Sequence, residues 1–216
     1  MKQSEVLLAS TAIRNKLKQS EDFKENPIDT TLDPVLPFTI SENIALIVIG
    51  QDPTVQNEKS RSKIKYTLNL DKNGSLKTYM LNVCRNLEIP FENIYATNVF
   101  KYFYTSPPQR TMSILHDHLH DNLDLLKREL ILFPNVPIIT LGLPVLQLLT
   151  DRSAQVNHYW DYNKKTKVSD LNYRRCLAKN NKLDRDLFPL PHQPSLRKSF
   201  YKNHLDSYLN FMKKTT

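Results

Sequence analysis

The chain has 216 residues, of which 40% are hydrophobic and 24% are charged, and its 30 lysines and arginines against 22 aspartates and glutamates give a net charge of +8. This composition is ordinary for a globular protein, favours a polyanionic partner, and contains no stretch near the roughly 18 uncharged residues of a membrane-spanning helix. The two cysteines, Cys84 and Cys176, lack the spacing of a metal cluster or disulfide scaffold, so we expect one cytoplasmic domain over residues 1–216 without a membrane partner.

Predicted helices and strands alternate along the chain. The strands are short runs of β-branched and aromatic residues that end in a turn or a polar residue, as in a buried parallel sheet. In chain order we predict a helix at 4–18, a strand at 44–50, a helix at 75–87, a strand at 93–100, a helix at 111–133, a strand at 136–142, a short helix at 143–149, an edge strand at 185–192 and a helix at 203–214. This order predicts an α/β fold, a three-layer αβα sandwich around a central four-stranded parallel sheet. The polar and basic stretch at 155–185 is too long for a simple connection and predicts a hairpin or a surface insertion.

Polar residues follow each predicted strand. They are Gln51 and Asp52 after the first, Asn98 near the end of the second, Gly142 after the third and His192 after the fourth. In open parallel sheets, ligands bind beyond the carboxyl ends of the strands, so we expect these groups to form one site. Gly50 allows a tight turn or a close approach to a ligand, and Pro53 holds Asp52 extended, so that Gln51 and Asp52 project from the rim.

Four motifs in this order resemble those of the uracil-DNA glycosylase superfamily. They are GQDP at 50–53, IYATNVFKYFYTSPPQR at 94–110, IITLG at 138–142 and HQPSLR at 192–197. The first is similar to the water-activating motif of the main family, and the second resembles the asparagine-bearing strand, especially of the iron–sulfur branch. The resemblance implies a uracil-DNA glycosylase-like fold. It also implies a monofunctional DNA repair enzyme that flips a uracil from DNA and hydrolyses its N-glycosidic bond, leaving an abasic site.

The resemblance implies two catalytic residues, Asp52 and His192. Breaking this bond develops positive charge on the sugar and negative charge on the base, so a site needs an anion near one and a hydrogen-bond donor near the other. By resemblance, Asp52 activates the attacking water and stabilises the sugar cation, while His192 donates to the uracil carbonyl. The alternatives are a local Asx turn or cap for Asp52, and a loop histidine that packs beside Pro191 and Pro194.

The resemblance also implies base-binding roles for Gln51, Tyr66 and Asn98. An asparagine presents both a donor and an acceptor, which suits the edge of a base. The alternative for Asn98 is a buried amide that holds two loops together. We predict that Tyr66 stacks on the flipped base, although a tyrosine at this position fits a core role equally well.

Contacts to DNA are implied for Ser75, Ser195, Leu196 and Arg197. Leu196 stands four residues after His192, which is the family's spacing for a leucine that wedges into the duplex. Ser75 resembles the serine that binds phosphate at a helix start, and Ser195 and Arg197 suit flanking phosphates. For Arg197, a solvated charged loop is the alternative.

The chain departs from the family after GQDP. The main family has a tyrosine there that excludes thymine, whereas this chain has Thr54, so we predict a roomier pocket that also accepts 5-substituted uracils unless Tyr102 or Tyr104 fills the space. The loop after Thr54 has no glycine, and the last motif reads His-Gln-Pro-Ser instead of His-Pro-Ser-Pro. Lys101 is followed by Tyr102, not by a cysteine ligand, so we expect no iron–sulfur cluster and no other cofactor.

His116, His118 and His120 form the only other constellation of potential ligands. His116 and His120 share a helical face, but no further ligand stands at a convincing distance, so we expect no metal. We expect a monomer whose partner is uracil-containing DNA, and no protein partner can be inferred. Two other functions remain open: an inactive or weakly active glycosylase-fold module that binds DNA or protein, and a hydrolase or transferase acting on small nucleosides.

Overall fold

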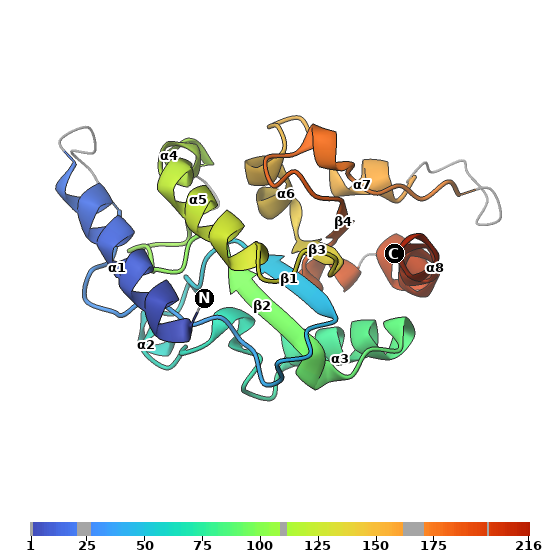
Figure 1. The fold of residues 1–216 in the computed structure, drawn as a ribbon, viewed down its shortest axis with the longest axis horizontal. Helices are drawn as coiled ribbons and strands as arrows, with labels where there is room; N and C mark the ends of the chain where they lie inside the picture. Colours follow the sequence, from blue (N-terminus) through green and yellow to red (C-terminus); the bar gives the residue numbers. More distant parts are fainter. Residues whose placement is uncertain (1, 21–26, 109–111, 162–170, 198) are drawn as a thin grey trace.

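The computed structural model describes residues 2–20, 27–108, 112–161, 171–197 and 199–216 (Figure 1). Its centre is a parallel sheet of four strands in the order β2-β1-β3-β4. The strands are β1 (Leu46–Gly50), β2 (Ile94–Asn98), β3 (Ile138–Leu141) and β4 (Leu187–Leu190), and every residue in them is buried. The register places Gly50 beside Asn98 and Leu141 beside Leu190, so the carboxyl ends of all four strands lie at one edge.

Helices cover both faces of the sheet. They are α1 (Gln3–Gln19), α2 (Glu58–Arg61), α3 (Ser75–Leu87), α4 (Met112–Asp117), α5 (Leu119–Leu130), α6 (Leu143–Leu149), α7 (Val156–Tyr159) and α8 (Ser199–Thr215). Successive residues of β1 alternate between two cores: Leu46 and Val48 pack with α3 and α8, while Ile47 and Ile49 pack with α4, α5 and α6. The predicted α/β class, with layers on both faces of a four-stranded parallel sheet, is therefore confirmed. Within the described ranges, no helix is both long and apolar enough to cross a bilayer.

Helix α3 forms as its sequence predicts. Met80, Val83, Cys84 and Leu87 recur at helical spacing and are all buried against the sheet. The helix ends at Glu88, whose left-handed backbone (φ 58°) breaks the hydrogen-bond ladder. This packing holds the first residues of α3 next to the carboxyl ends of the strands.

The prediction of one continuous helix over 111–133 is wrong. From Met112 onward the structure contains two helices, α4 and α5, with a turn at His118 between them. The side-chain amide of Asn122 donates to the carbonyl of His118 at 2.8 Å, in competition with the backbone ladder. The His118 ring meanwhile contacts the Tyr104 hydroxyl at 3.2 Å. Polar side chains thus interrupt a stretch whose apolar spacing is continuous.

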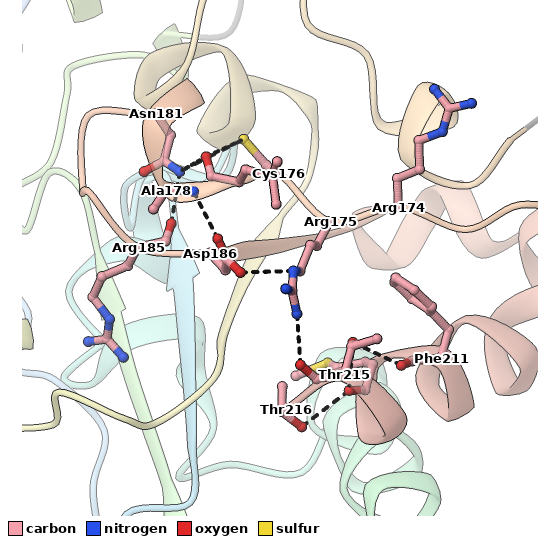
Figure 2. A network of polar contacts seen from close by, with 12 residues as sticks. Arg174, Arg175, Cys176, Ala178, Asn181, Arg185, Asp186, Phe211, Thr215 and Thr216 are labelled. Atoms are coloured by element: carbon pink, nitrogen blue, oxygen red, sulfur yellow. Dashed lines mark hydrogen bonds and ion pairs between the residues drawn. The ribbon is translucent and has the colours of Figure 1, made fainter.

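The segment predicted as a hairpin or insertion at 155–185 lies partly outside the described residues. Its last part returns along the outer edge of β4, where Cys176 and Leu187 exchange two antiparallel backbone hydrogen bonds of 2.8 Å. Figure 2 shows how this part is held: Arg175 lies 2.8 Å from Asp186 and also donates to the C-terminal end of α8. These contacts join the edge strand to the last helix, and β4 is the edge strand that its prolines predict.

Candidate functional site

A cavity of about 1830 Å³ lies at the carboxyl ends of the strands. Gln51 and Asp52 reach it from the end of β1, Gly142 from the end of β3 and His192 from the end of β4. The start of α3 forms another wall, with Ser75. The sequence prediction that these residues meet at one edge is in agreement with this arrangement.

All three glycines of the chain line this cavity, and two of them are required by packing. A Cβ atom at Gly50 would overlap Asn98 Oδ1 and lie 2.9 Å from Leu68 Cδ2. Gly142 has a left-handed backbone (φ 95°), and a Cβ there would lie 3.2 Å from His192 Cβ. The glycines after β1 and β3 therefore make room for Asn98 and His192.

Gly50→Ala is expected to destabilise the fold by about 1–3 kcal/mol, because the new methyl group must displace the Asn98 side chain from a packed position. Urea denaturation measures the loss. Gly74→Ala is the matched control: nothing lies within 4 Å of a Cβ there, and we expect a change below about 1 kcal/mol. Equal losses for the two variants would contradict the close packing at Gly50.

The Asp52 carboxyl group is held by its neighbours and is poorly solvated. Gln51 Nε2 donates to Oδ2 at 2.7 Å, and the Thr54 amide donates to Oδ1 at 2.8 Å. Burial raises the pKa of Asp52 to about 6, although hydrogen bonds from Thr54 and Gln51 and the positive charge of Arg61 act in the opposite direction. Asp52 thus forms the Asx turn named above as its alternative role and also faces the cavity. Near pH 7 it is a carboxylate basic enough to accept a proton.

Because burial raises the pKa of Asp52 from 3.8 to about 6, the protonated carboxyl group stabilises the fold below about pH 4. That contribution is lost as the pH rises through 6. Asp52→Asn cannot ionise, so we expect it to unfold at a higher temperature than the wild type at pH 8 and at a similar temperature at pH 4. Thermal denaturation at the two pH values measures the difference.

Asp151 provides the control for this prediction. It forms the same kind of turn, with the Ser153 amide at 2.8 Å, but it is exposed, and its hydrogen bonds from Ser153 lower its pKa. Its ionised form therefore stabilises the fold above its unfolded-state pKa, and this stabilisation is lost as the pH falls. Asp151→Asn should accordingly be slightly less stable than the wild type at pH 8. If both substitutions changed the stability at pH 8 in the same direction, that result would contradict the burial of the Asp52 carboxyl group.

His192 projects into the same cavity from the end of β4. The side chain is exposed, yet the surrounding walls remove enough water to lower its pKa. It is therefore neutral at pH 7 and carries a single N–H donor. The backbone carbonyl of His192 accepts a hydrogen bond of 2.8 Å from Ser195, which fixes the turn into the HQPSLR segment. Pro191 and Pro194 line the cavity together with His192, whose ring is accessible from it.

Asn98 is in the expected place, at the end of β2, but it is enclosed. The residue is fully buried, and neither Oδ1 nor Nδ2 has a hydrogen-bond partner among the described residues. The amide therefore does not hold two loops together, which was the alternative. A buried amide without partners is costly, and such groups in native structures commonly serve a ligand or water.

Tyr66 does not line the cavity. It is half-buried and packs against the core between the sheet and α3, while its backbone pairs with Leu36. Leu68, two residues later, lines the cavity beside Gly50 instead. The structure therefore does not bring Tyr66 together with Asp52 and His192.

A buried ion pair lies next to β2 and contacts the backbone of Asn98. This pair was not predicted from the sequence. Lys101 Nζ lies 2.6 Å from Glu129 Oε1, and both side chains are fully buried. Lys101 Nζ also donates to the Asn98 carbonyl, and the Tyr95 and Thr97 hydroxyls donate to Glu129 Oε2, each at 2.8 Å. Two features of the sequence could have indicated this pair: Lys101 stands within a run of aromatic residues, and Glu129 falls on the apolar face of α5.

The residues expected to contact DNA are partly described. Ser75, the first residue of α3, and Ser195 both line the cavity. Leu196 and Arg197 belong to a 3-10 turn, Gln193–Arg197, but their side chains lie outside the described part of the structure. Three cations at the cavity wall were not predicted: Arg61, Lys72 and Lys77.

Thr54 lines the cavity and is anchored on both sides. Its amide donates to Asp52, and its hydroxyl oxygen accepts a hydrogen bond of 2.8 Å from the Tyr104 amide. The rings of Tyr102 and Tyr104 are fully buried behind the sheet and do not line the cavity. Neither ring therefore fills the cavity beside Thr54, and the roomier pocket stays a prediction.

The three histidines of the HDHLH stretch do not come together as ligands. His118 is buried, with its pKa lowered by burial to about 4, whereas His120 is exposed and pairs with Asp121 at 3.1 Å. Across the described ranges, no three His, Cys, Asp or Glu side chains gather as a metal site would require. Cys84 and Cys176 are free and buried in different cores.

The cavity thus combines a carboxylate of raised pKa, a neutral imidazole and cationic side chains in its wall, with a buried amide adjoining it. Such a set can activate water on one side of a bound group and donate a hydrogen bond on the other. No family model matches the chain, and no curated protein matches it either. The function is therefore inferred from the chemistry of the site.

Proposed function

We propose that this protein is a monofunctional DNA glycosylase of the uracil-DNA glycosylase type, which hydrolyses the N-glycosidic bond of uracil in DNA and leaves an abasic site. One observation carries the proposal: Asp52 and His192, 140 positions apart in the chain, face the same cavity from the ends of β1 and β4. Since β3 lies between those strands, the two strand ends are about 10 Å apart. A nucleoside can be accommodated in that span.

In this mechanism Asp52 acts on the sugar side. As a carboxylate it orients a water molecule toward C1′ and stabilises the positive charge that develops there. The water oxygen bonds to C1′ while the bond from C1′ to N1 breaks, and Asp52 accepts the proton that the water loses. With a pKa of about 6, Asp52 is ionised at neutral pH and still basic enough for this step.

His192 acts on the base side. The electron pair of the broken bond leaves with the uracil, and its negative charge spreads onto the carbonyl oxygens. The neutral His192 ring donates its single N–H to one of these oxygens, and Asn98 offers a donor and an acceptor to the base edge. Gln51, which holds the Asp52 carboxylate at 2.7 Å, reaches the cavity beside the base.

The basic walls of the cavity suit the DNA backbone. Ser75 lies at the start of α3, where free amide groups favour a phosphate, and Lys72 and Lys77 stand beside it. The net charge of +8 strengthens the attraction to DNA through counterion release. In this proposal Ser195 and Arg197 contact flanking phosphates, Leu196 enters the base stack, and the protein works as a monomer without a cofactor.

A catalytically weak module that binds DNA is the second candidate, and the enclosure of Asn98 favours it. A duplex with one uracil, the same duplex with cytosine or with 5-hydroxymethyluracil at that position, and free deoxyuridine distinguish the possibilities. Each is incubated with the protein, and the duplexes are then treated with alkali. Breaks at uracil and at 5-hydroxymethyluracil, and none at cytosine, are expected for the proposed enzyme. Duplex binding without breaks would favour the module, and deoxyuridine cleavage would favour a nucleoside hydrolase.

A further inference from the structure

The Asn98 amide cannot be reached from the cavity in this structure. Asn98 is fully buried and is absent from the cavity lining, although Gly50, its neighbour in the sheet, is part of that lining. Neither amide atom has a hydrogen-bond partner among the described residues. A ligand can therefore use this amide only after something that covers it has moved.

Leu68 lies close to the amide. The point where a Gly50 Cβ would lie overlaps Asn98 Oδ1 and is 2.9 Å from Leu68 Cδ2, so the leucine methyl group and the amide oxygen flank the same position. Leu68 also lines the cavity, on the side from which a ligand must arrive. Its side chain is therefore placed where it can cover the amide from the cavity.

The backbone beneath Leu68 is strained. Leu68 (φ 58°) and Asn69 (φ 53°) are consecutive residues in the left-handed region, which is uncommon for residues other than glycine and especially for a bulky apolar one. The turn is anchored just before them, where the Thr67 amide donates to the Leu36 carbonyl at 2.8 Å. The strain therefore lies at Leu68 itself and at the residue that follows it.

We propose that Leu68 is a specificity-determining residue that covers Asn98 and must swing aside before a base can pair with the amide. This inference rests on the proposed function of the site. The chemistry of the covered group defines the ligand as a planar heterocycle whose edge carries a donor next to an acceptor, because only such an edge satisfies both amide atoms. A ring without that edge gains nothing that compensates for displacing Leu68, so the cover adds selectivity to the site.

Three variants separate the side chain from the backbone strain. Leu68→Ala removes the cover and keeps the strained backbone, Leu68→Gly removes both, and Leu68→Met keeps both. Leu81→Ala is the matched control, because Leu81 is an exposed leucine on α3 outside the cavity. The measurements are the hydrogen exchange of the Asn98 side-chain amide by NMR, identified by its loss in Asn98→Asp, and the affinity for free uracil by calorimetry.

We expect the amide to exchange about fivefold faster, or more, in Leu68→Ala and Leu68→Gly than in the wild type, and these two variants to bind uracil about fivefold more tightly. Leu68→Met and Leu81→Ala should behave as the wild type does. Wild-type exchange as fast as that of the exposed Asn180, or weaker uracil binding by Leu68→Ala, would overturn the proposal. Faster exchange in Leu68→Ala without uracil binding by any variant would support the cover and overturn the glycosylase function instead.

Discussion

Asp52→Asn is expected to lower the rate of uracil release from DNA by about 100-fold or more, because an amide cannot accept the proton of the attacking water. The substitution keeps the shape of the side chain, and the Thr54 amide at 2.8 Å can still donate to the remaining carbonyl oxygen. Single-turnover kinetics on a duplex with one uracil measure the loss. For the wild type, the rate should fall as the pH drops through about 6, the pKa of Asp52.

Glu58→Gln is the control for this prediction. Glu58 is a second carboxylate that lines the cavity, but its side chain is 82% exposed. Its removal should change the rate by less than about threefold, since exposed charges contribute little. Equal rates for Asp52→Asn and the wild type would remove Asp52 from the mechanism.

Lys101→Met is expected to destabilise the protein by about 3–5 kcal/mol, because it leaves the buried Glu129 carboxylate without its cation. The 2.6 Å pair has no access to water, and the two hydroxyl groups that donate to Glu129 cannot neutralise its charge. Urea denaturation at pH 7 measures the change. The same substitution frees the Asn98 carbonyl, so it should also disturb the end of β2.

Two comparisons test the physical reason for that loss. Lys101→Met combined with Glu129→Gln removes both charges and should recover a large part of the stability. Lys16→Met breaks a pair of similar length, 2.7 Å from Lys16 to Asp121, but the lysine side chain is 73% exposed. It should cost less than about 1 kcal/mol. Equal losses for Lys101→Met and Lys16→Met would show that burial does not govern the strength of these pairs.

The sheet and its ligand-binding edge could be predicted because local patterns determine them. β1 and β3 are mostly apolar and are buried on both faces, which distinguishes buried parallel strands from half-exposed ones. Parallel strands present their carboxyl ends at one edge, so the meeting of Asp52 and His192 follows from topology alone. The glycines at 50 and 142 add a second local signal, since each makes room for a site residue.

Other features depend on contacts between segments that are distant in the chain. Tyr66 and Leu68 are both apolar and two residues apart, and only the left-handed turn at Leu68 and Asn69 decides which of them faces the cavity. No glycine marks that turn. The break at His118 likewise coincides with side-chain hydrogen bonds, one between its ring and the Tyr104 hydroxyl and one from Asn122 to its carbonyl, that apolar spacing does not reveal.

The buried pair of Lys101 and Glu129 was missed for a related reason. Each residue alone is typical of a solvated surface, and burial is tolerable only because the two meet 2.6 Å apart behind β2. The two residues are 28 positions apart in the chain: Lys101 lies in the loop after β2, and Glu129 lies in α5. The pairing is a property of the packed layers rather than of either segment.

The direct release of uracil tests the central claim that Asp52 and His192 form a glycosylase site. A duplex with one uracil is incubated with substoichiometric protein at pH 8, and the free base is quantified by chromatography. We expect several uracils released for each protein molecule, no free base from the same duplex with cytosine in place of uracil, and none above background with Asp52→Asn. No release of uracil by the folded wild-type protein, together with tight duplex binding, would contradict the claim.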